Sequence, residues 1–99
     1  DPYLVLSELL LRRIDAIIVS VSAEGMDESY LGRRIDESFI SDIREVEKRF
    51  GVNPLGEGGE YESFVTGMLG RGRIRIIESR KSWSGSSGYL KLDCAFQES

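Results

Sequence analysis

The order of apolar and polar positions predicts a helix, a strand, a second helix and then a run of strands. Leucines at near-helical spacing, with Pro2 suited to a first turn, predict a helix over residues 2–13. The β-branched and mostly apolar run at residues 14–21 is typical of a central strand that is covered on both faces. The first quarter of the chain is therefore expected to supply one helix and one core strand.

The second helix is predicted over residues 36–50. Its apolar side chains recur at intervals of four, three and four residues, which places them in one stripe on the helix surface. Asp36 is suited to cap the start of this helix, and Gly51 is suited to end it. The stripe consists of Phe39, Ile43, Val46 and Phe50.

The second half of the chain predicts three strands. Residues 62–66 follow a glycine-rich loop and favour a short strand, and residues 71–76 alternate arginine with glycine or isoleucine, which favours arginines on one strand face and core residues on the other. Residues 90–96 alternate leucine, cysteine and phenylalanine with Lys91, Asp93 and Ala95. In this last pattern Cys94 is expected to be a small buried side chain.

The two last strands are expected to form a C-terminal β-hairpin, because a flexible serine and glycine turn over residues 84–88 separates them. Trp83 and Tyr89 flank this turn and are expected to pack across it. The element order favours an α+β fold in which helices pack on one mixed β-sheet. At 99 residues, 40% hydrophobic and 30% charged, a single domain over residues 1–99 is expected. The first residue is not Met, which suggests that the chain begins inside a longer protein.

The charge balance argues against a nucleic-acid partner or an anionic membrane. The chain carries 13 Lys and Arg against 17 Asp and Glu, a net charge of −4. No apolar run is long enough for a membrane span and no signal segment opens the chain, so we expect a cytoplasmic protein. A single cysteine and the absence of histidine exclude an internal disulfide and a multi-cysteine zinc site. Carboxylates remain as the main candidates for chemistry.

The most unusual segment is residues 56–62, with the sequence GEGGEYE. Three carboxylates this close repel one another, and their pKa values rise unless a cation, an arginine or a backbone N–H group compensates. The segment therefore implies a partner, although glutamates oppose a bare phosphate cradle. An exposed acidic turn that leads into a strand is about equally consistent with this sequence. A Mg²⁺ site completed by water and substrate phosphate is a less favoured interpretation.

A second candidate is the segment at residues 31–36, with the sequence LGRRID. Arg33 and Arg34 can grip a carboxylate or a phosphate in a two-pronged manner. Taken alone, the pair is explained more simply by surface ion pairs, which are common and weak. The expected partners in such pairs are Glu28, Asp36 or Glu37. A third basic group, formed by Arg71, Arg73 and Arg75, is interpreted as a solvated strand face.

Three segments in this order and spacing, residues 17–21, 31–36 and 56–62, resemble the diphthine–ammonia ligases of the ATP pyrophosphatase family, especially the archaeal type. The resemblance covers nearly the whole chain and includes Trp83. It departs from the family at residues 65–69, where an acidic residue and a proline are usual. It implies that the chain is the C-terminal, substrate-side domain of a longer ATP-dependent ligase. The N-terminal half would bind ATP through a Ser-Gly-Gly-x-Asp-Ser loop that this chain lacks.

The resemblance also implies a reaction. ATP would activate the diphthine carboxylate on translation elongation factor 2 as an acyl-adenylate, and ammonia would displace AMP to leave the amide of diphthamide. ATP and Mg²⁺ are expected in the full-length enzyme, whereas the isolated fragment is expected to bind no cofactor or metal and to be inactive without the N-terminal nucleotide-binding domain. That domain, elongation factor 2 carrying diphthine, and ammonium are the expected partners. The alternative is a non-catalytic binding or regulatory module that recognises a protein or a small ligand.

Within this resemblance, the two motifs receive roles in substrate binding, and no catalytic residue is assigned. The glutamates would form an anionic wall that attracts the quaternary ammonium of diphthine or captures ammonium, with Tyr61 adding a cation–π contact. Arg33 or Arg34 would orient the substrate carboxylate or stabilise developing phosphate charge. The predicted substrate-binding residues are Arg33, Arg34, Glu57, Gly58, Gly59, Glu60, Tyr61 and Glu62.

Overall fold

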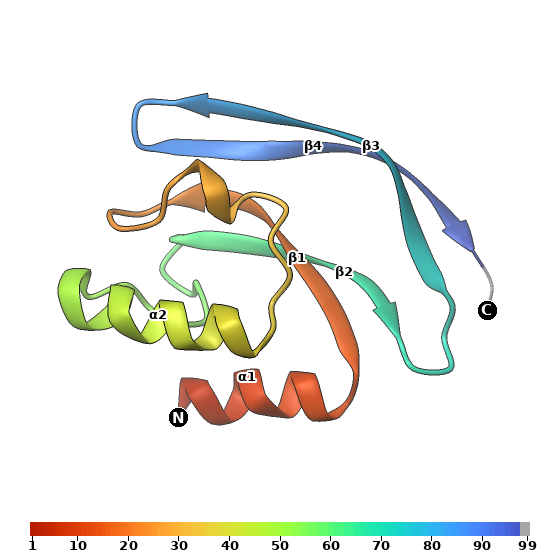
Figure 1. Ribbon diagram of the computed structural model, residues 1–99, viewed down its shortest axis with the longest axis horizontal. Coiled ribbons are helices and arrows are strands. Elements are labelled where there is room, and N and C mark those ends of the chain that lie inside the picture. The colour runs from red at the N-terminus through yellow and green to blue at the C-terminus, as the bar shows by residue number, and fades with distance from the viewer. Residues whose placement is uncertain (98–99) are drawn as a thin grey trace.

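The structure is a computed structural model that describes residues 1–97 (Figure 1). One α-helix precedes the first strand, and a 3-10 turn and a second α-helix lie between the first and second strands. Two long strands follow. The elements are α1 (Pro2–Leu11), β1 (Ile14–Ser22), η1 (Glu28–Tyr30), α2 (Glu37–Phe50), β2 (Tyr61–Met68), β3 (Arg73–Ser84) and β4 (Ser87–Gln97). Every predicted element is present, and most boundaries lie within three residues of the prediction.

Both helices begin at a capping aspartate, and α2 also ends at its predicted glycine. The Asp1 side chain accepts a hydrogen bond from the Tyr3 backbone N–H at the start of α1. The Asp36 side chain does the same for Phe39 at the start of α2, at 2.9 Å. Gly51 ends α2 in the left-handed conformation, with φ of 73°, which glycine adopts at little cost. The predicted caps of α2 are therefore confirmed.

The four strands form one sheet in which every pair is antiparallel, in the order β1-β2-β3-β4, with β4 also pairing with β1. The expected α+β class is confirmed, but the expected mixed sheet is wrong. Short connections at residues 69–72 and 85–86 join β2 to β3 and β3 to β4. Parallel neighbours need a crossover of a dozen or more residues, which these connections cannot supply.

Strand β1 has partners along both of its edges. On one edge it pairs with β2 along its length, from Ile14 opposite Met68 to Val21 opposite Tyr61. On the other edge, residues 32–35 pair with the middle of β1, and β4 pairs with its last residues, Ser20–Ser22. The segment that carries the predicted arginine pair is thus an extra strand-like partner of β1.

The hydrophobic core lies between β1, β2 and the helices. Figure 1 places α1 and α2 together on one side of β1 and β2, and the ribbon of β3 and β4 on the other side. Phe39 and Ile43 of α2 are fully buried, as predicted for the apolar stripe, whereas Phe50 at the end of the stripe is exposed. Fully buried side chains also come from Leu6 of α1 and Ile18 of β1. No helix within residues 1–97 is long and apolar enough to cross a membrane.

One prediction is wrong in the part of the β3–β4 ribbon that is distant from its turn. Leu90 is buried, but Cys94 is exposed and Phe96 is 64% exposed, so the expectation of a buried cysteine is wrong. The apolar alternation of β4 is real, but β1 pairs with β4 only at residues 87–89. Beyond that point β4 pairs only with β3. Leu90 and Leu92 still pack against the core, whereas Cys94 and Phe96 lie past it.

The start of β3 and the turn of the ribbon differ in part from the expectations. β3 begins at Arg73, so Arg71 lies in the preceding turn and not on the strand, and the isoleucines opposite the arginines are half-buried. Trp83 lies across the ribbon against Gly88, where an added Cβ would be 2.5 Å from the indole ring. Tyr89 is exposed, so only the tryptophan packs across the turn as predicted.

Candidate functional site

The glycine-rich motif is part of a segment over residues 53–62, here called the acidic loop, which connects α2 to β2 and includes the first two residues of β2. Internal hydrogen bonds fix its backbone. Asn53 accepts from the backbone N–H of Leu55 at 2.8 Å, and its own carbonyl accepts from Gly56 N–H at 2.9 Å. Gly59 N–H then donates to the Gly56 carbonyl at 3.0 Å. The acidic loop is therefore two successive turns with a defined shape.

Glu60 differs from the other two glutamates because its carboxylate turns into the loop. Its Oε2 accepts from the backbone N–H of Asn53 at 2.7 Å, and its Oε1 is buried without a hydrogen-bond partner among the described residues. The N–H groups of Asn53 and of Glu60 itself hold the pKa of this carboxyl below its usual range, against the opposing effect of burial. Glu57 and Glu62 are exposed. The loop thus presents two free carboxylates and uses the third to hold itself together.

Tyr61 is part of the core. Its side chain is 5% exposed, its hydroxyl donates to the Pro54 carbonyl at 2.6 Å, and its ring meets Phe39 edge-on at a centroid distance of 5.6 Å. Burial raises the pKa of Tyr61 to about 12. The ring is therefore not exposed for the predicted cation–π contact with a ligand. Its position indicates instead that it anchors the acidic loop to α2.

Arg33 is held against α2. Its guanidinium forms an ion pair with Asp42 at 2.8 Å and donates to the Ser38 hydroxyl at 3.1 Å. It also lies over the rings of Tyr30 and Phe39, at 5.2 and 5.6 Å from their centroids. Arg33 is thus tied to the helix through charge, hydrogen bonding and ring contacts together.

Arg34 lies on the other face of the same segment, as alternation along an extended chain requires. Its guanidinium meets Asp15 Oδ1 at 2.8 Å, and Arg73 meets Oδ2 of the same carboxylate at 2.8 Å. The two guanidinium groups, Arg73 first, keep the pKa of Asp15 low despite partial burial. The expected ion-pair partners Glu28, Asp36 and Glu37 are wrong. Asp42 and Asp15 take their place, and the two guanidinium groups meet different carboxylates on opposite faces of the segment.

The two predicted motifs lie on opposite edges of β1. Residues 32–35 pair along one edge, whereas the acidic loop joins β2 on the other edge, with Ser22 N–H donating to the Glu60 carbonyl at 2.8 Å. The cavities that contain Arg34 are lined by Asp15 and Arg73 and by no residue of the acidic loop. Within residues 1–97, no three His, Cys, Asp or Glu side chains are grouped closely enough to hold a metal ion.

Sequence reasoning did not single out Asp15, and it interpreted Arg73 as part of a solvated face. The available signal was the single charged residue within the mostly apolar run of β1. A lone carboxylate in a strand covered on both faces calls for a cationic partner. Its partners could not be read from the sequence, because they depend on the register of two other segments against β1.

The role of Glu60 predicts a pH-dependent contribution to stability. The folded-state pKa of Glu60 lies below its ordinary value of 4.5, so the contribution is present above that value and is lost as pH falls through the folded-state pKa. We expect Glu60→Gln to lower the free energy of unfolding near neutral pH, with the difference from the wild type shrinking on acidification. Urea unfolding of both proteins between about pH 3 and pH 7 measures this. Glu57→Gln is the matched control, and an equal pH response of the two variants would contradict the assignment.

Comparison of the sequence with those of known proteins shows which family it matches. Residues 1–97 match the family model described as diphthamide synthase C-terminal domain. Proteins named diphthine–ammonia ligase from Bos taurus and Homo sapiens are 41% and 39% identical over 61 residues, which is 61% of this chain and 22% of each relative. The Schizosaccharomyces pombe protein of the same name is 29% identical over 99% of this chain and 16% of its own length.

The chain therefore spans about a fifth of the length of these curated relatives. They come from mammals and a yeast, which argues against the expected archaeal type. The family match extends over all the elements described above, from α1 to β4. By this match, the chain belongs to the diphthamide synthase C-terminal domain family.

Proposed function

We propose that this chain is the substrate-side domain of an ATP-dependent diphthine–ammonia ligase. The observation that carries the proposal is the family match over residues 1–97, supported by relatives with that printed name. In the proposed reaction, the diphthine carboxylate on elongation factor 2 attacks the α-phosphorus of ATP and pyrophosphate leaves. Ammonia then attacks the acyl-adenylate carbonyl, so that AMP leaves and the amide forms. The protein as a whole would work in the cytoplasm.

The adenylation chemistry is assigned to the N-terminal nucleotide-binding half and not to this domain. The sequence contains no Ser-Gly-Gly-x-Asp-Ser loop, and no residue of the described chain is assigned to ATP or Mg²⁺. This domain would bind and orient the modified side chain of elongation factor 2. Such a division fits a site built from carboxylates and arginines, without histidine or a buried nucleophile.

The residues of the acidic loop would have two different roles. Glu57 and Glu62 point into solvent and would attract the quaternary ammonium of diphthine or an ammonium ion. Glu60 and Tyr61 hold the loop in shape through Asn53 and Pro54, so they would position the two free carboxylates. Gly58 leaves room for the Glu60 carboxylate, since an added Cβ would be 2.8 Å from its Oε1, and nothing lies within 4 Å of a Cβ added at Gly59. Because the loop has a fixed backbone, little ordering is required when a cation binds.

Arg33 and Arg34 would also have different roles. Arg33 is engaged with Asp42 and two aromatic rings, so it would support the segment. Arg34 shares Asp15 with Arg73 and remains largely exposed, so it is the better candidate to orient an anionic group of the substrate. The orientation of a carboxylate by a guanidinium is a charge-assisted, directional interaction.

The test changes the two exposed carboxylates. In the intact protein, the double variant Glu57→Gln and Glu62→Gln is expected to lower kcat/KM for amidation of elongation factor 2 about tenfold or more, because two charges that attract the cation are removed without loss of shape. AMP release measured with ATP and ammonium present reports the rate.

The matched control is Glu45→Gln, which removes an exposed charge on α2 and should leave kcat/KM unchanged. If the double variant is as active as the wild type, the proposed role of the acidic loop is wrong. If the intact protein binds diphthine-bearing elongation factor 2 but releases no AMP with ATP and ammonium, the non-catalytic binding alternative replaces the ligase proposal.

A further inference from the structure

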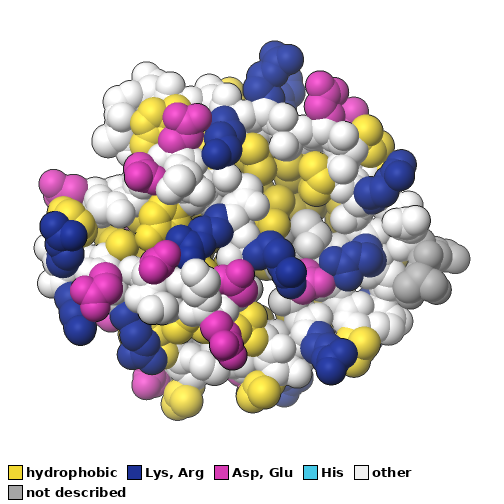
Figure 2. All heavy atoms as spheres, viewed as in Figure 1, with side chains coloured by type: hydrophobic (Ala, Val, Ile, Leu, Met, Phe, Trp, Pro, Cys, Tyr) yellow, Lys and Arg dark blue, Asp and Glu magenta, His cyan; other side chains and the backbone are white. Residues whose placement is uncertain are grey.

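Two adjoining cavities, of about 580 and 350 Å³, lie where the end of α1, the start of β1 and the start of β3 meet. They share Asp15, Arg34 and Arg73. Arg13 lines the first cavity and Arg75 the second. These five residues define the arginine groove. Figure 2 shows Lys and Arg side chains across the middle of one face of the molecule, with Asp and Glu side chains beside them.

The arginine groove carries an excess of positive charge. Four guanidinium groups line it, and Asp15 is the one carboxylate among the described lining residues. Asp15 already engages Arg34 and Arg73, and no carboxylate lies within ion-pair distance of Arg13 or Arg75 in the described part of the chain. Cations gathered in a concave site repel one another unless an anion joins them. The groove therefore favours an anionic ligand.

Two local features shape the lining of the arginine groove. Gly67 on β2 leaves space for Arg73, since an added Cβ would be 3.1 Å from the Arg73 guanidinium carbon. Arg13 has a φ of 56°, the left-handed region that side chains rarely adopt, and it lines the groove from the junction of α1 and β1.

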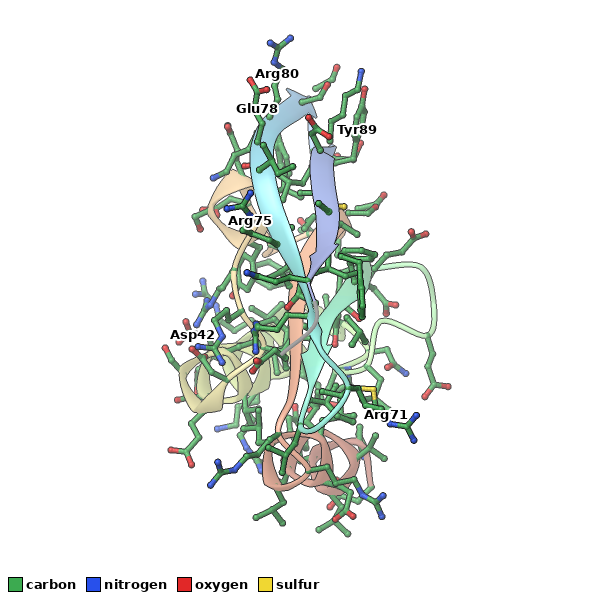
Figure 3. All side chains as sticks on the ribbon, turned by 90° about the vertical axis from the view of Figure 1, so that its right-hand side faces the viewer. Asp42, Arg71, Arg75, Glu78, Arg80 and Tyr89 are labelled. Carbon is green, nitrogen blue, oxygen red and sulfur yellow. The ribbon has the colours of Figure 1, made fainter. Side chains whose placement is uncertain are left out.

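Arg71 does not belong to the groove, which shows that the grouping is selective. Figure 3 places Arg75 on the same side of the molecule as Asp42 and Arg71 on the opposite side. Arg71 lies in the turn before β3, so it does not share the strand face of Arg75. A basic surface that only raised solubility would not need to separate them.

We propose that the arginine groove binds the phosphate group of a small ligand, with Arg73 and Arg75 as previously unassigned ligand-binding residues. A phosphate offers several oxygens to several guanidinium forks and carries more charge than one carboxylate. The ligand is expected to be small, because the net charge of the chain, −4, provides no general attraction for a nucleic acid. The inference deepens the proposed role of Arg34. It is tested by binding alone, so its failure and the failure of the amidation role are distinguishable.

The experiment titrates the intact protein with inorganic pyrophosphate and, separately, with AMP. The Nε–Hε NMR signals of Arg73 and Arg75, assigned by their loss on substitution, report on the groove alone, so anion binding elsewhere does not enter. Saturable shifts of both signals are expected with pyrophosphate. A tighter response to AMP identifies a nucleotide as the source of the phosphate, and an equal or weaker response identifies a free oxyanion.

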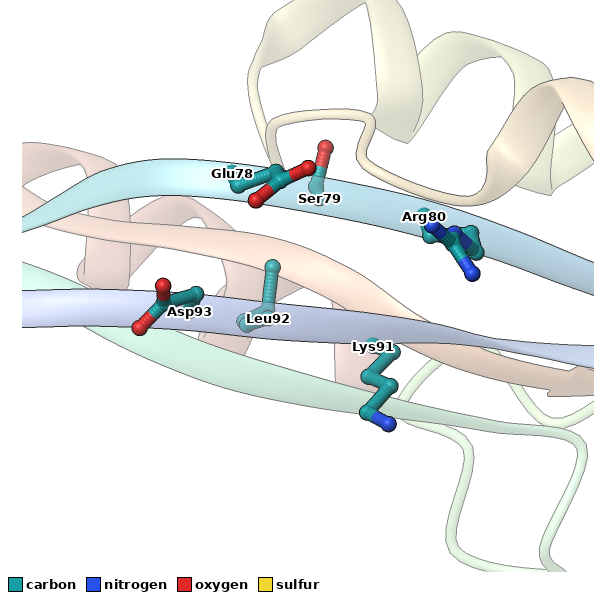
Figure 4. Close-up of a pocket in the computed structure, with 6 residues that line it drawn as sticks. All are labelled: Glu78, Ser79, Arg80, Lys91, Leu92 and Asp93. Atoms are coloured by element: carbon teal, nitrogen blue, oxygen red, sulfur yellow. The ribbon is translucent and has the colours of Figure 1, made fainter.

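Variants then separate a built site from general surface charge. Arg75→Gln is expected to weaken pyrophosphate binding about tenfold, read from the Arg73 signal. Gly67→Ala, which obliges the Arg73 guanidinium to shift by a few tenths of an ångström without changing the charge, is expected to weaken it to a smaller extent, read from Arg75. Arg80→Gln is the matched control on the same strand. Figure 4 shows Arg80 and Lys91 beside Glu78 and Asp93, a site with balanced charges outside the groove.

The result that supports the proposal is weaker binding in Arg75→Gln and Gly67→Ala with unchanged binding in Arg80→Gln. Equal weakening of pyrophosphate binding by Arg75→Gln and Arg80→Gln would mean that general surface charge, and not a built site, attracts the anion. That result would contradict the proposal. The absence of saturable shifts in the wild type would overturn the proposal outright. Shifts with single-stranded RNA but not with pyrophosphate or AMP would also overturn it in favour of a nucleic-acid surface.

Discussion

Replacing Phe39 by alanine is expected to lower the free energy of unfolding by about 3–5 kcal/mol, the range for removing a large buried aromatic side chain. Phe39 is 0% exposed and lies on α2 where the helix meets the sheet. Its ring meets Tyr30 and Tyr61 edge-on, at centroid distances of 6.2 and 5.6 Å. A domain of this size has a total stability of about 5–15 kcal/mol, so the variant would lose a large share of it.

Chemical unfolding followed by circular dichroism measures this change. Phe96→Ala is the matched control, since it removes the same ring from a side chain that is 64% exposed and should cost less than about 1 kcal/mol. Similar losses in the two variants would mean that Phe39 is not central to the core. A loss confined to Phe39→Ala also implies damage to the acidic loop, because Tyr61 rests against Phe39 and holds Pro54.

Replacing Gly56 by alanine is expected to lower the free energy of unfolding by about 3 kcal/mol. Two causes add. The φ of 71° is unfavourable for alanine by about 1–2 kcal/mol. In addition, an added Cβ would be 2.5 Å from the Tyr61 carbonyl oxygen, and this clash with backbone adds about 1–3 kcal/mol of overpacking.

Gly59→Ala separates the two causes. Gly59 lies in the same loop with a φ of 88°, but nothing lies within 4 Å of the position of an added Cβ. Its substitution should cost about 1–2 kcal/mol, from backbone strain alone. Urea unfolding of both variants gives the comparison. Equal losses would show that the contact with the Tyr61 carbonyl yields easily and that the acidic loop is less rigid than its hydrogen bonds indicate.

Local signals in the sequence predict the elements well because their causes are local. Asp36 and Gly51 mark the ends of α2 since the cap of each involves only neighbouring backbone groups. The run at Ile14–Ser22 becomes a central strand because its β-branched side chains suit burial on both faces. These features require no knowledge of what lies elsewhere in the chain.

The features that sequence reasoning missed depend on how distant segments meet. Cys94 alternates correctly with its apolar neighbours, yet it is exposed because β1 covers only the first residues of β4. Arg34 meets Asp15, 19 residues away, because residues 32–35 align against β1. Tyr61 looked like an exposed member of a motif, but it is the first residue of β2 and points into the core. Each case depends on the register of the paired segments and on which residues the core covers. Neither can be read from the linear pattern of the sequence.

The position of β1 has a consequence for how a growing chain folds. Its first partners, residues 32–35 and β2, follow soon after it in the sequence, but its last residues pair with residues 87–89. During synthesis, Ser20–Ser22 therefore have no β4 beside them until nearly the whole domain has left the ribosome. Long-range pairings of this kind are slow compared with helix formation. Within residues 1–97, the pairing of β1 with β4 therefore has to wait until β4 has been synthesised, whereas both helices precede it in the sequence.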